Sequence, residues 1–388
     1  MLIKQGQNIQ QVLDSNPSET QFELEAGVFD GPINFVGLSN KHLFSNVKDA
    51  VSITTRTGPS CVGISASSNH IFLSNLTFKN NNQLGSIIDI NGSAVRIEDC
   101  KLLGSPTLGQ HRGIAANGAD ISIVRTRIED CFLIGRDAQA ICGWNGTENL
   151  LVEDCYLEGG AQSVMFGGAD PENIFRVPTN IKIINSVLTK KIEWYSLSIV
   201  PQMKCALELK NCKNFYCFNC TLEYAGTAQG QGAFLIVLTP RNQSGKASYS
   251  TVQNVLIELC VCRYGGGCIN FLGSDTNWPS GPLRNVSIMD TEFSEINHRN
   301  TWGGSGRIFQ FMKAPQNTVI EDTTIKGVNG QQLNANAYFI GEAPLNLVIK
   351  NIKWPQTKYG LKIDNGGSGL DSLRKYCPSL VYENVENI

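Results

Sequence analysis

The sequence predicts an all-β solenoid, a chain wound into stacked coils of short strands. A motif recurs along the chain, and two kinds of short strand alternate in a fixed order at intervals of roughly 24 to 40 residues. Gly, Asn and Asp residues separate the strands, as expected for turns. Hardly any helical periodicity lies between them, which argues against βαβ units and leucine-rich repeats.

The first kind of strand carries the recurrent motif. It reads VRIEDCKLLG at 95–104, TRIEDCFLIG at 126–135 and LLVEDCYLEG at 150–159, with weaker copies further along. Stacked coils place equivalent residues about 4.8 Å apart, so the small residues at one aligned position predict a buried ladder. Its predicted members are Cys100, Cys131, Cys155, Ser186, Cys220, Cys260, Thr291 and Thr323.

The second kind of strand includes GIAAN at 113, SVMFGG at 163, ALELKN at 206, CINFLGSD at 268 and RIFQFMKA at 307. In ALELKN, Leu207 and Leu209 alternate with Glu208 and Lys210. Because successive side chains of a strand point to opposite faces, the two leucines are expected to face the core. Glu208 and Lys210 are then expected to point outward.

Both ends of the chain have the character of caps, which an open solenoid needs to cover its exposed core and edge amides. Residues 1–30 predict an N-terminal cap with a helix that turns Ile9, Val12 and Leu13 to one side. Residues 365–388 predict a C-terminal cap with a short helix before the last strand. We therefore expect one β-solenoid domain over residues 1–388.

Composition and charge limit the classes of partner that we expect for this chain. The net charge of −2 and the pI of about 6.1 offer no basic surface for a phosphate backbone, which argues against nucleic acid. No apolar run has the length of a signal peptide or a membrane span, so no membrane insertion is expected. The odd number of cysteines, 13, favours reduced thiols. Action outside a cell would then follow lysis or transport on a virion, and the alternative location is the cytoplasm.

Three stretches, GGADP at 167–171, LELKN at 207–211 and VLTPRN at 237–242, together with the opening segment, carry a family resemblance. Through them the sequence resembles the right-handed parallel β-helices of the pectate-lyase-like superfamily, and within it a mostly uncharacterised group of bacterial proteins. The resemblance covers nearly the whole chain. It implies a right-handed parallel β-helix with an N-terminal capping helix, and a polysaccharide as the partner.

Long insertions between the strands predict the walls of a groove beside Glu208 and Lys210. These insertions bring aromatic side chains, which suit the apolar faces of sugars, so we predict Trp194, Tyr195, Tyr249 and Trp278 as substrate-binding residues. The insertions are residues 167–178, 189–203, 239–250 and 272–282, and all four are expected to leave from one corner of the solenoid.

The resemblance to alginate-lyase-type β-helices favours a polysaccharide lyase that cleaves a uronate-containing glycan by β-elimination. Elimination needs a group that offsets the carboxylate and a base that removes the C5 proton. Lys210 is the predicted base, Arg241 offsets the carboxylate, and Glu208 orients Lys210 or helps Asp170 to bind Ca²⁺, the one candidate cofactor. Asp275 is predicted to contact the substrate.

Three alternatives stay open from the sequence. A glycoside hydrolase would pair two carboxylates across the scissile bond, and Glu208 with Asp275 is the predicted pair, with Asp170 also on this face. A non-catalytic glycan-binding or structural β-helix, such as a virion or surface component, would lack cleavage and would form a trimer if it were a tailspike. Glu208 and Lys210 would in the simplest case be a solvated ion pair.

Overall fold

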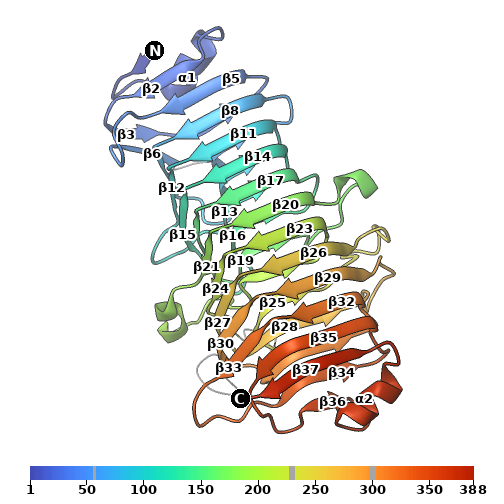
Figure 1. Cartoon of the computed structure of the whole chain (residues 1–388). Coiled ribbons are helices and arrows are strands. Elements are labelled where there is room, and N and C mark those ends of the chain that lie inside the picture. Colours follow the sequence, from blue (N-terminus) through green and yellow to red (C-terminus); the bar gives the residue numbers. More distant parts are fainter. Residues whose placement is uncertain (56–57, 227–231, 297–302) are drawn as a thin grey trace.

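The structure of this protein is a computed structural model that describes residues 1–55, 58–226, 232–296 and 303–388. The chain forms a right-handed parallel β-helix, with its termini at opposite ends of the stack (Figure 1). Each full coil contributes three strands that pair in parallel with the equivalent strands of the next coil. The predicted all-β solenoid is confirmed, with three strands in a coil where the sequence distinguished two.

Three rows of parallel strands form the sides of the helix, and we name them face A, face B and face C. Face A consists of β1 Leu2–Ile3, β2 Gln21–Leu24, β5 Ser39–Phe44, β8 Asn69–Ser74, β11 Ser93–Glu98, β14 Ala119–Val124, β17 Glu148–Glu153, β20 Thr179–Ile184, β23 Cys212–Phe218, β26 Val252–Glu258, β29 Leu283–Met289, β32 Gln316–Glu321, β35 Leu345–Trp354 and β37 Val381–Asn387.

Face B follows face A in each coil. It consists of β3 Gly27–Asp30, β6 Val51–Thr55, β9 Thr77–Asn80, β12 Lys101–Leu103, β15 Arg127–Cys131, β18 Tyr156–Gly159, β21 Val187–Thr189, β24 Thr221–Glu223, β27 Val261–Gly265, β30 Glu292–Ile296 and β33 Thr324–Gly327. The long strand β35 pairs with both β32 and β33, so faces A and B join into one 25-stranded sheet.

Face C closes the coil as a separate 12-stranded sheet. It consists of β4 Ile33–Phe35, β7 Ser60–Ile64, β10 Ser86–Ile90, β13 Arg112–Ala116, β16 Gln139–Gly143, β19 Gln162–Phe166, β22 Leu207–Leu209, β25 Phe234–Leu238, β28 Gly267–Leu272, β31 Arg307–Met312, β34 Ala335–Ile340 and β36 Leu361–Ile363. This face contains the second kind of strand that the sequence distinguished.

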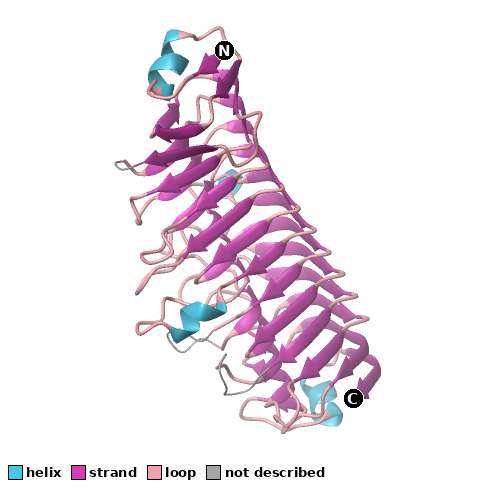
Figure 2. Ribbon diagram, turned by 90° about the vertical axis from the view of Figure 1, so that its left-hand side faces the viewer, coloured by secondary structure: helices cyan, strands magenta, loops and turns pink. Residues whose placement is uncertain are grey.

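The helices are short and lie at the ends or in loops (Figure 2). Helix α1, Ile9–Ser15, begins at the capping residue Asn8 and buries Ile9 and Leu13 against the core. Helix α2, Leu370–Tyr376, precedes the last strand and buries Leu373. Two 3₁₀ helices, η1 Ile174–Arg176 and η2 Ile192–Ser196, lie in the long loops. No helix in the described residues is long and apolar enough to cross a membrane.

The ladder of small residues exists, but one predicted member is wrong. Residues equivalent to Cys100 follow the corner from face A to face B, and strand pairing places Thr126 there, because Glu98 pairs with Val124 and Lys101 pairs with Arg127. Cys131 instead ends β15 on face B, five residues further on. The observed ladder is Cys100, Thr126, Cys155, Ser186, Cys220, Cys260, Thr291 and Thr323.

Hydrogen bonding explains why these residue types replace one another in the ladder. Each ladder side chain donates to the carbonyl two residues earlier, for example Thr126 Oγ1 to Val124 O at 3.0 Å and Ser186 Oγ to Ile184 O at 2.8 Å. Thiols of the ladder make the same contact. The position therefore requires a small buried side chain that can donate a hydrogen bond at the corner.

Candidate functional site

Face C provides the floor of the site. The register of β19, β22, β25 and β28 places Leu207 and Leu209 level with inward residues of the neighbouring coils, as predicted. On the outer side, Glu208 is level with Val237, Asn270 and Gln310 of the next three coils. A row of side chains that starts with a carboxylate and ends with two amides therefore runs along the helix axis.

Two walls flank this floor, one on each edge of face C. The entry wall consists of residues 132–138 and 190–206, which precede face C strands. The exit wall consists of residues 167–178, 239–251 and 273–282, which follow face C strands. The predicted single corner is therefore wrong for one insertion, since residues 189–203 lead into β22 from the opposite edge.

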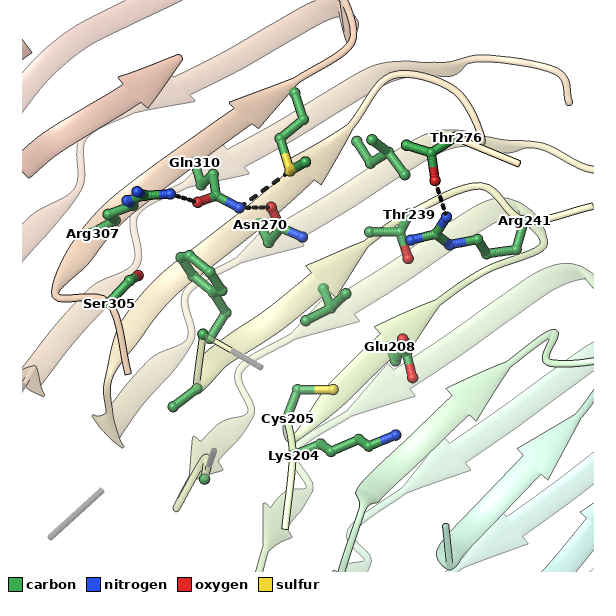
Figure 3. A pocket seen from close by; sticks show the side chains of 17 residues that line it. Lys204, Cys205, Glu208, Thr239, Arg241, Asn270, Thr276, Ser305, Arg307 and Gln310 are labelled. Carbon is green, nitrogen blue, oxygen red and sulfur yellow. Dashed lines mark hydrogen bonds between the residues drawn. The ribbon is translucent and has the colours of Figure 1, made fainter. Parts of the chain in front are cut away.

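A cavity of about 480 Å³ lies over the floor between these walls. Glu208, Asn270 and Gln310 line it from the floor, Lys204 from the entry wall and Arg241 from the exit wall. Figure 3 shows Arg307 beside Gln310 at one end of the cavity, with Glu208 and Lys204 at the other. Charged and amide groups from all three sides thus converge on one cavity.

Glu208 and Lys210 are paired, but they are not a solvated pair. Lys210 Nζ lies 3.6 Å from Glu208 Oε2, with side-chain exposures of 19% and 8%. The same Oε2 atom accepts a hydrogen bond from Gln162 Nε2 at 2.5 Å. The carboxylate is therefore fixed on the floor by two neighbours, and its orientation is determined before any ligand arrives.

A second carboxylate, Asp137 of the entry wall, lies close to this network. Lys204 Nζ lies 2.8 Å from both of its oxygens, and Gln162 Nε2 lies 3.4 Å from Asp137 Oδ2. Because Gln162 Nε2 contacts both acids, Asp137 Oδ2 and Glu208 Oε2 can be no farther apart than the sum of the two distances, 5.9 Å. The Gln162 amide thus bridges the two carboxylates, and each carboxylate also contacts one lysine.

Arg241 and Asp275 belong to the exit wall. Arg241 Nη1 lies 3.1 Å from Asp275 Oδ1 and also donates to Thr276 Oγ1. Burial acts to raise the pKa of Asp275, but the backbone N–H groups of Asn277 and Asn242, together with Arg241, outweigh it and lower the pKa. The Asp275 carboxylate is 2% exposed. It therefore links the loops of the exit wall and does not face the cavity.

Arg307 begins β31 at the far end of the cavity. Its guanidinium carbon lies 3.6 Å from the centre of the Tyr338 ring, and its Nη1 donates to Gln310. Burial lowers the pKa of Arg307. Among the described residues no carboxylate forms an ion pair with it, and its buried Nε has no hydrogen-bond partner. This cation is therefore neutralised less than the others around the cavity.

Two of the predicted aromatic residues, Trp194 and Tyr195, lie in the entry wall and pack within it. Trp194 is 3% exposed and packs on Phe132, with ring centres 4.8 Å apart, and on Met203. Tyr195 Oη donates to Tyr224 O at 3.1 Å, and burial raises the pKa of its phenol. The prediction of Trp194 as a sugar-stacking surface is corrected, because its ring is enclosed by the wall that it anchors.

The exit wall contains the other two aromatic residues and Asp170. Tyr249 Oη donates to Pro171 O at 2.6 Å, and Asp170 Oδ2 accepts from the backbone N–H groups of Ser244 and Lys246. These contacts clamp residues 167–178 to residues 239–251. Trp278 is 51% exposed and remains a predicted sugar-binding residue.

The predicted Ca²⁺ ligands do not form a fitting donor set. Asp170 is used by the clamp between two loops, whereas Glu208 lies on the floor against Gln162 and Lys210. Within the described residues, no group of three or more His, Cys, Asp or Glu side chains could hold a metal ion. A requirement for Ca²⁺ stays a prediction.

Several residues of the site were not predicted from the sequence. Asn270 and Gln310 could have been found, because aligning the second kind of strand places both level with Glu208. Asp137 and Lys204 lie in irregular segments, and no sequence pattern predicts that these two loops meet. All residues predicted for the site lie in the described part of the chain.

No protein-family model matches the sequence. No curated protein is significantly similar to it. Three solved structures that share the fold are 11–12% identical in sequence to this chain, a level that establishes the fold alone.

The catalytic unit of a GH87 α-1,3-glucanase from Streptomyces thermodiastaticus superposes with a TM-score of 0.63 over 98% of this chain and 66% of its own. The Dettilon tailspike protein gives 0.57 over 93% of this chain and 68% of its own. PfbA, a surface adhesin of Streptococcus pneumoniae, gives 0.51 over 98% and 86%. The chain thus spans about two thirds of the length of the first two.

Proposed function

We propose that this protein is carbohydrate-active, binds an acidic polysaccharide in the face C cavity and cleaves it by β-elimination. The observation that carries the proposal is the convergence of Glu208, Lys204, Arg241 and Arg307 with two amide side chains on one cavity between two walls. The glucanase and the tailspike with the same fold support a role with polysaccharides by analogy. The chemistry has to come from the residues of this chain.

For elimination, the uncharged amine of Lys210 removes the proton at C5 of a uronate and becomes an ammonium ion beside Glu208. The bond from C4 to the leaving oxygen breaks, and a double bond forms between C4 and C5. A proton from solvent or from an acid of the site completes the leaving hydroxyl. Arg241 offsets the substrate carboxylate, since both of its contacts with the exit wall use Nη1 and leave other N–H groups. Glu208 orients Lys210.

The test is incubation with a panel of uronate-containing and neutral polysaccharides, with Ca²⁺ or with a chelator, followed for unsaturated ends and reducing ends. We expect both kinds of end from an acidic polymer. Lys210→Ala is expected to lower kcat by roughly 10²- to 10⁴-fold, the usual effect of a general base. Lys182→Ala, at an exposed lysine on face A, is the matched control. Full activity of Lys210→Ala would exclude Lys210 as the base.

Hydrolysis is a second candidate, and the amide bridge at Gln162 favours it. Asp137 and Glu208 approach within 5.9 Å, close to the separation of about 5 to 5.5 Å found in retaining glycosidases. This pair replaces the predicted pair of Glu208 and Asp275, because Asp275 is occupied within the exit wall.

The same panel separates these reactions. Hydrolysis would give reducing ends without unsaturated ends, and Asp137→Asn and Glu208→Gln would each abolish them, while Lys210→Ala would retain most activity. Binding without new ends of either kind would contradict both reactions and leave a glycan-binding protein.

A further inference from the structure

Arg307 stands out among the charged residues of the cavity. Of the charged residues that line it, Lys204 is paired with Asp137, Arg241 with Asp275, and Glu208 with Lys210, which lies outside the lining, all within 3.6 Å. Arg307 has a phenol ring and an amide in contact instead, and Asp364, which accepts from Tyr338 Oη, acts on it only through its charge, beyond ion-pair distance. A partly buried guanidinium that has no carboxylate in ion-pair contact loses hydration with little ionic compensation.

Its position is fixed firmly enough to serve recognition. The stack on Tyr338 holds the guanidinium plane, and Gln310, which accepts from Arg307 Nη1, donates in turn to Asn270 Oδ1 at 2.9 Å. All four residues stand on the adjacent strands β28, β31 and β34. Rigid strands with linked side chains set the direction of the free N–H groups.

Unsatisfied hydrogen-bonding atoms lie at this end of the cavity. Arg307 Nε and Ser305 Oγ are buried, and neither has a hydrogen-bond partner in the described part of the chain. Ser305 and Arg307 both line the cavity (Figure 3). Buried donors normally have partners, so an unsatisfied N–H of the guanidinium and an unsatisfied hydroxyl in the same lining are suited to an oxyanion supplied by a ligand.

We infer that Arg307 forms a subsite for a carboxylate on a sugar other than the one that reacts. This inference rests on the proposed function. The guanidinium fork matches a carboxylate bidentately. Glu208 and Arg307 are separated along the helix axis by three strand steps, from β22 to β31, which is on the order of 14 Å, and Arg307 also lies three residues before Gln310, the residue level with Glu208. This distance is longer than one sugar ring, so the substrate would carry acidic groups on separate sugars.

The experiment is calorimetric titration with short oligogalacturonate and with its neutral methyl ester. We expect the protein to prefer the acid. Arg307→Gln is expected to lower the affinity for the acid by roughly 10- to 100-fold, in line with a charge-assisted pair, and to leave the affinity for the ester unchanged. Arg307→Lys is expected to retain part of the preference. Arg284→Gln, at an exposed arginine on face A, is the matched control.

Equal affinity of Arg307→Gln and the wild type for the acid, or an equal loss for acid and ester, would overturn the subsite. Failure of the wild type to bind oligogalacturonate, oligomannuronate and oligoguluronate would overturn it as well. Circular dichroism of each variant separates a folding defect from a binding defect. The proposed cleavage fails separately, since wild-type protein that prefers the acid but yields no new ends would keep the subsite and lose the reaction.

Discussion

At the scale of single residues, Lys190 is a buried lysine at the base of the entry wall. It is fully buried, and its Nζ donates to Gly159 O and to Cys205 O, each at 2.8 Å. Burial lowers the pKa of Lys190 from 10.5 to about 7. Since Cys205 lies at the other end of the entry-wall loop and lines the cavity, this lysine closes the base of the wall.

The lowered pKa predicts a dependence of stability on pH. Between about pH 7 and 10.5 the unfolded chain holds the lysine proton and the folded protein does not, so the contribution of Lys190 to stability rises with pH, by at most about 1.4 kcal/mol per pH unit. Below pH 7 the folded protein must hold a buried charge, and the full penalty applies. Lys190→Met is expected to remove this contribution, so its stability should rise less with pH than that of the wild type.

Urea unfolding at several pH values measures the slope. Lys182→Met, at an exposed lysine on face A, should keep the slope of the wild type. An unchanged slope in Lys190→Met would contradict the assignment. The slope is a better measure than stability at one pH, because the substitution also leaves two buried carbonyl groups without their donor.

The outward direction of Glu208 followed from the alternation in ALELKN, whereas its burial did not. Alternation determines the face of a sheet to which a side chain points, but the partners come from other coils and from loops. Gln162 lies one coil earlier and Asp137 lies on the entry wall. Such contacts depend on loop conformations that no short sequence pattern encodes.

At the scale of elements, the ladder of small residues shows both the strength and the weakness of the repeat. The letters IEDC occur at 97–100 and again at 128–131, yet the two copies lie on different faces. Register is determined by which residues point inward and by the corner between strands. Cys100 and Thr126 occupy the same corner position although they are different residue types. Aligning the two IEDC copies by sequence similarity therefore assigned Cys131 to the wrong position.

A second ladder, of asparagine residues, crosses the start of the face A strands. Asn214 donates to Asn180 at 2.9 Å and accepts from Asn254 at 2.8 Å, and its φ is 56°. Its members are Asn149, Asn180, Asn214, Asn254, Asn285, Asn317 and Asn346. Asparagine tolerates the left-handed conformation and also links neighbouring coils.

Asn214→Ala is expected to lower the free energy of unfolding by roughly 1–3 kcal/mol, because it loses both hydrogen bonds and strains a left-handed residue. Asn214→Gly loses the same hydrogen bonds but accepts the positive φ, so it should cost less. Urea unfolding of both variants measures the difference. Alanine that is as stable as glycine at this position would contradict a role for the backbone conformation.

At the scale of the whole molecule, the stack of coils explains why one face carries the site. Residues at equivalent positions of successive coils form rows, and loops at equivalent corners form walls, so a long surface arises from a short repeat. The solenoid and both capping helices could be predicted from the sequence because these features are local and recur. The cavity could not, because it depends on how walls from opposite edges meet.

The three comparison proteins show that this fold accommodates different activities, since they are a glucanase, a tailspike and an adhesin. Fold therefore does not decide the activity of this chain. The charged residues around the face C cavity are the features of the described structure that favour an acidic glycan.

We propose that an acidic glycan binds over face C between the entry and exit walls. A crystal structure of Glu208→Gln with bound oligogalacturonate or oligomannuronate tests it most directly. We predict saccharide density over β22, β25, β28 and β31, with a carboxylate within hydrogen-bond distance of Arg307. A saccharide bound on face A or face B, with the face C cavity empty, would contradict the account.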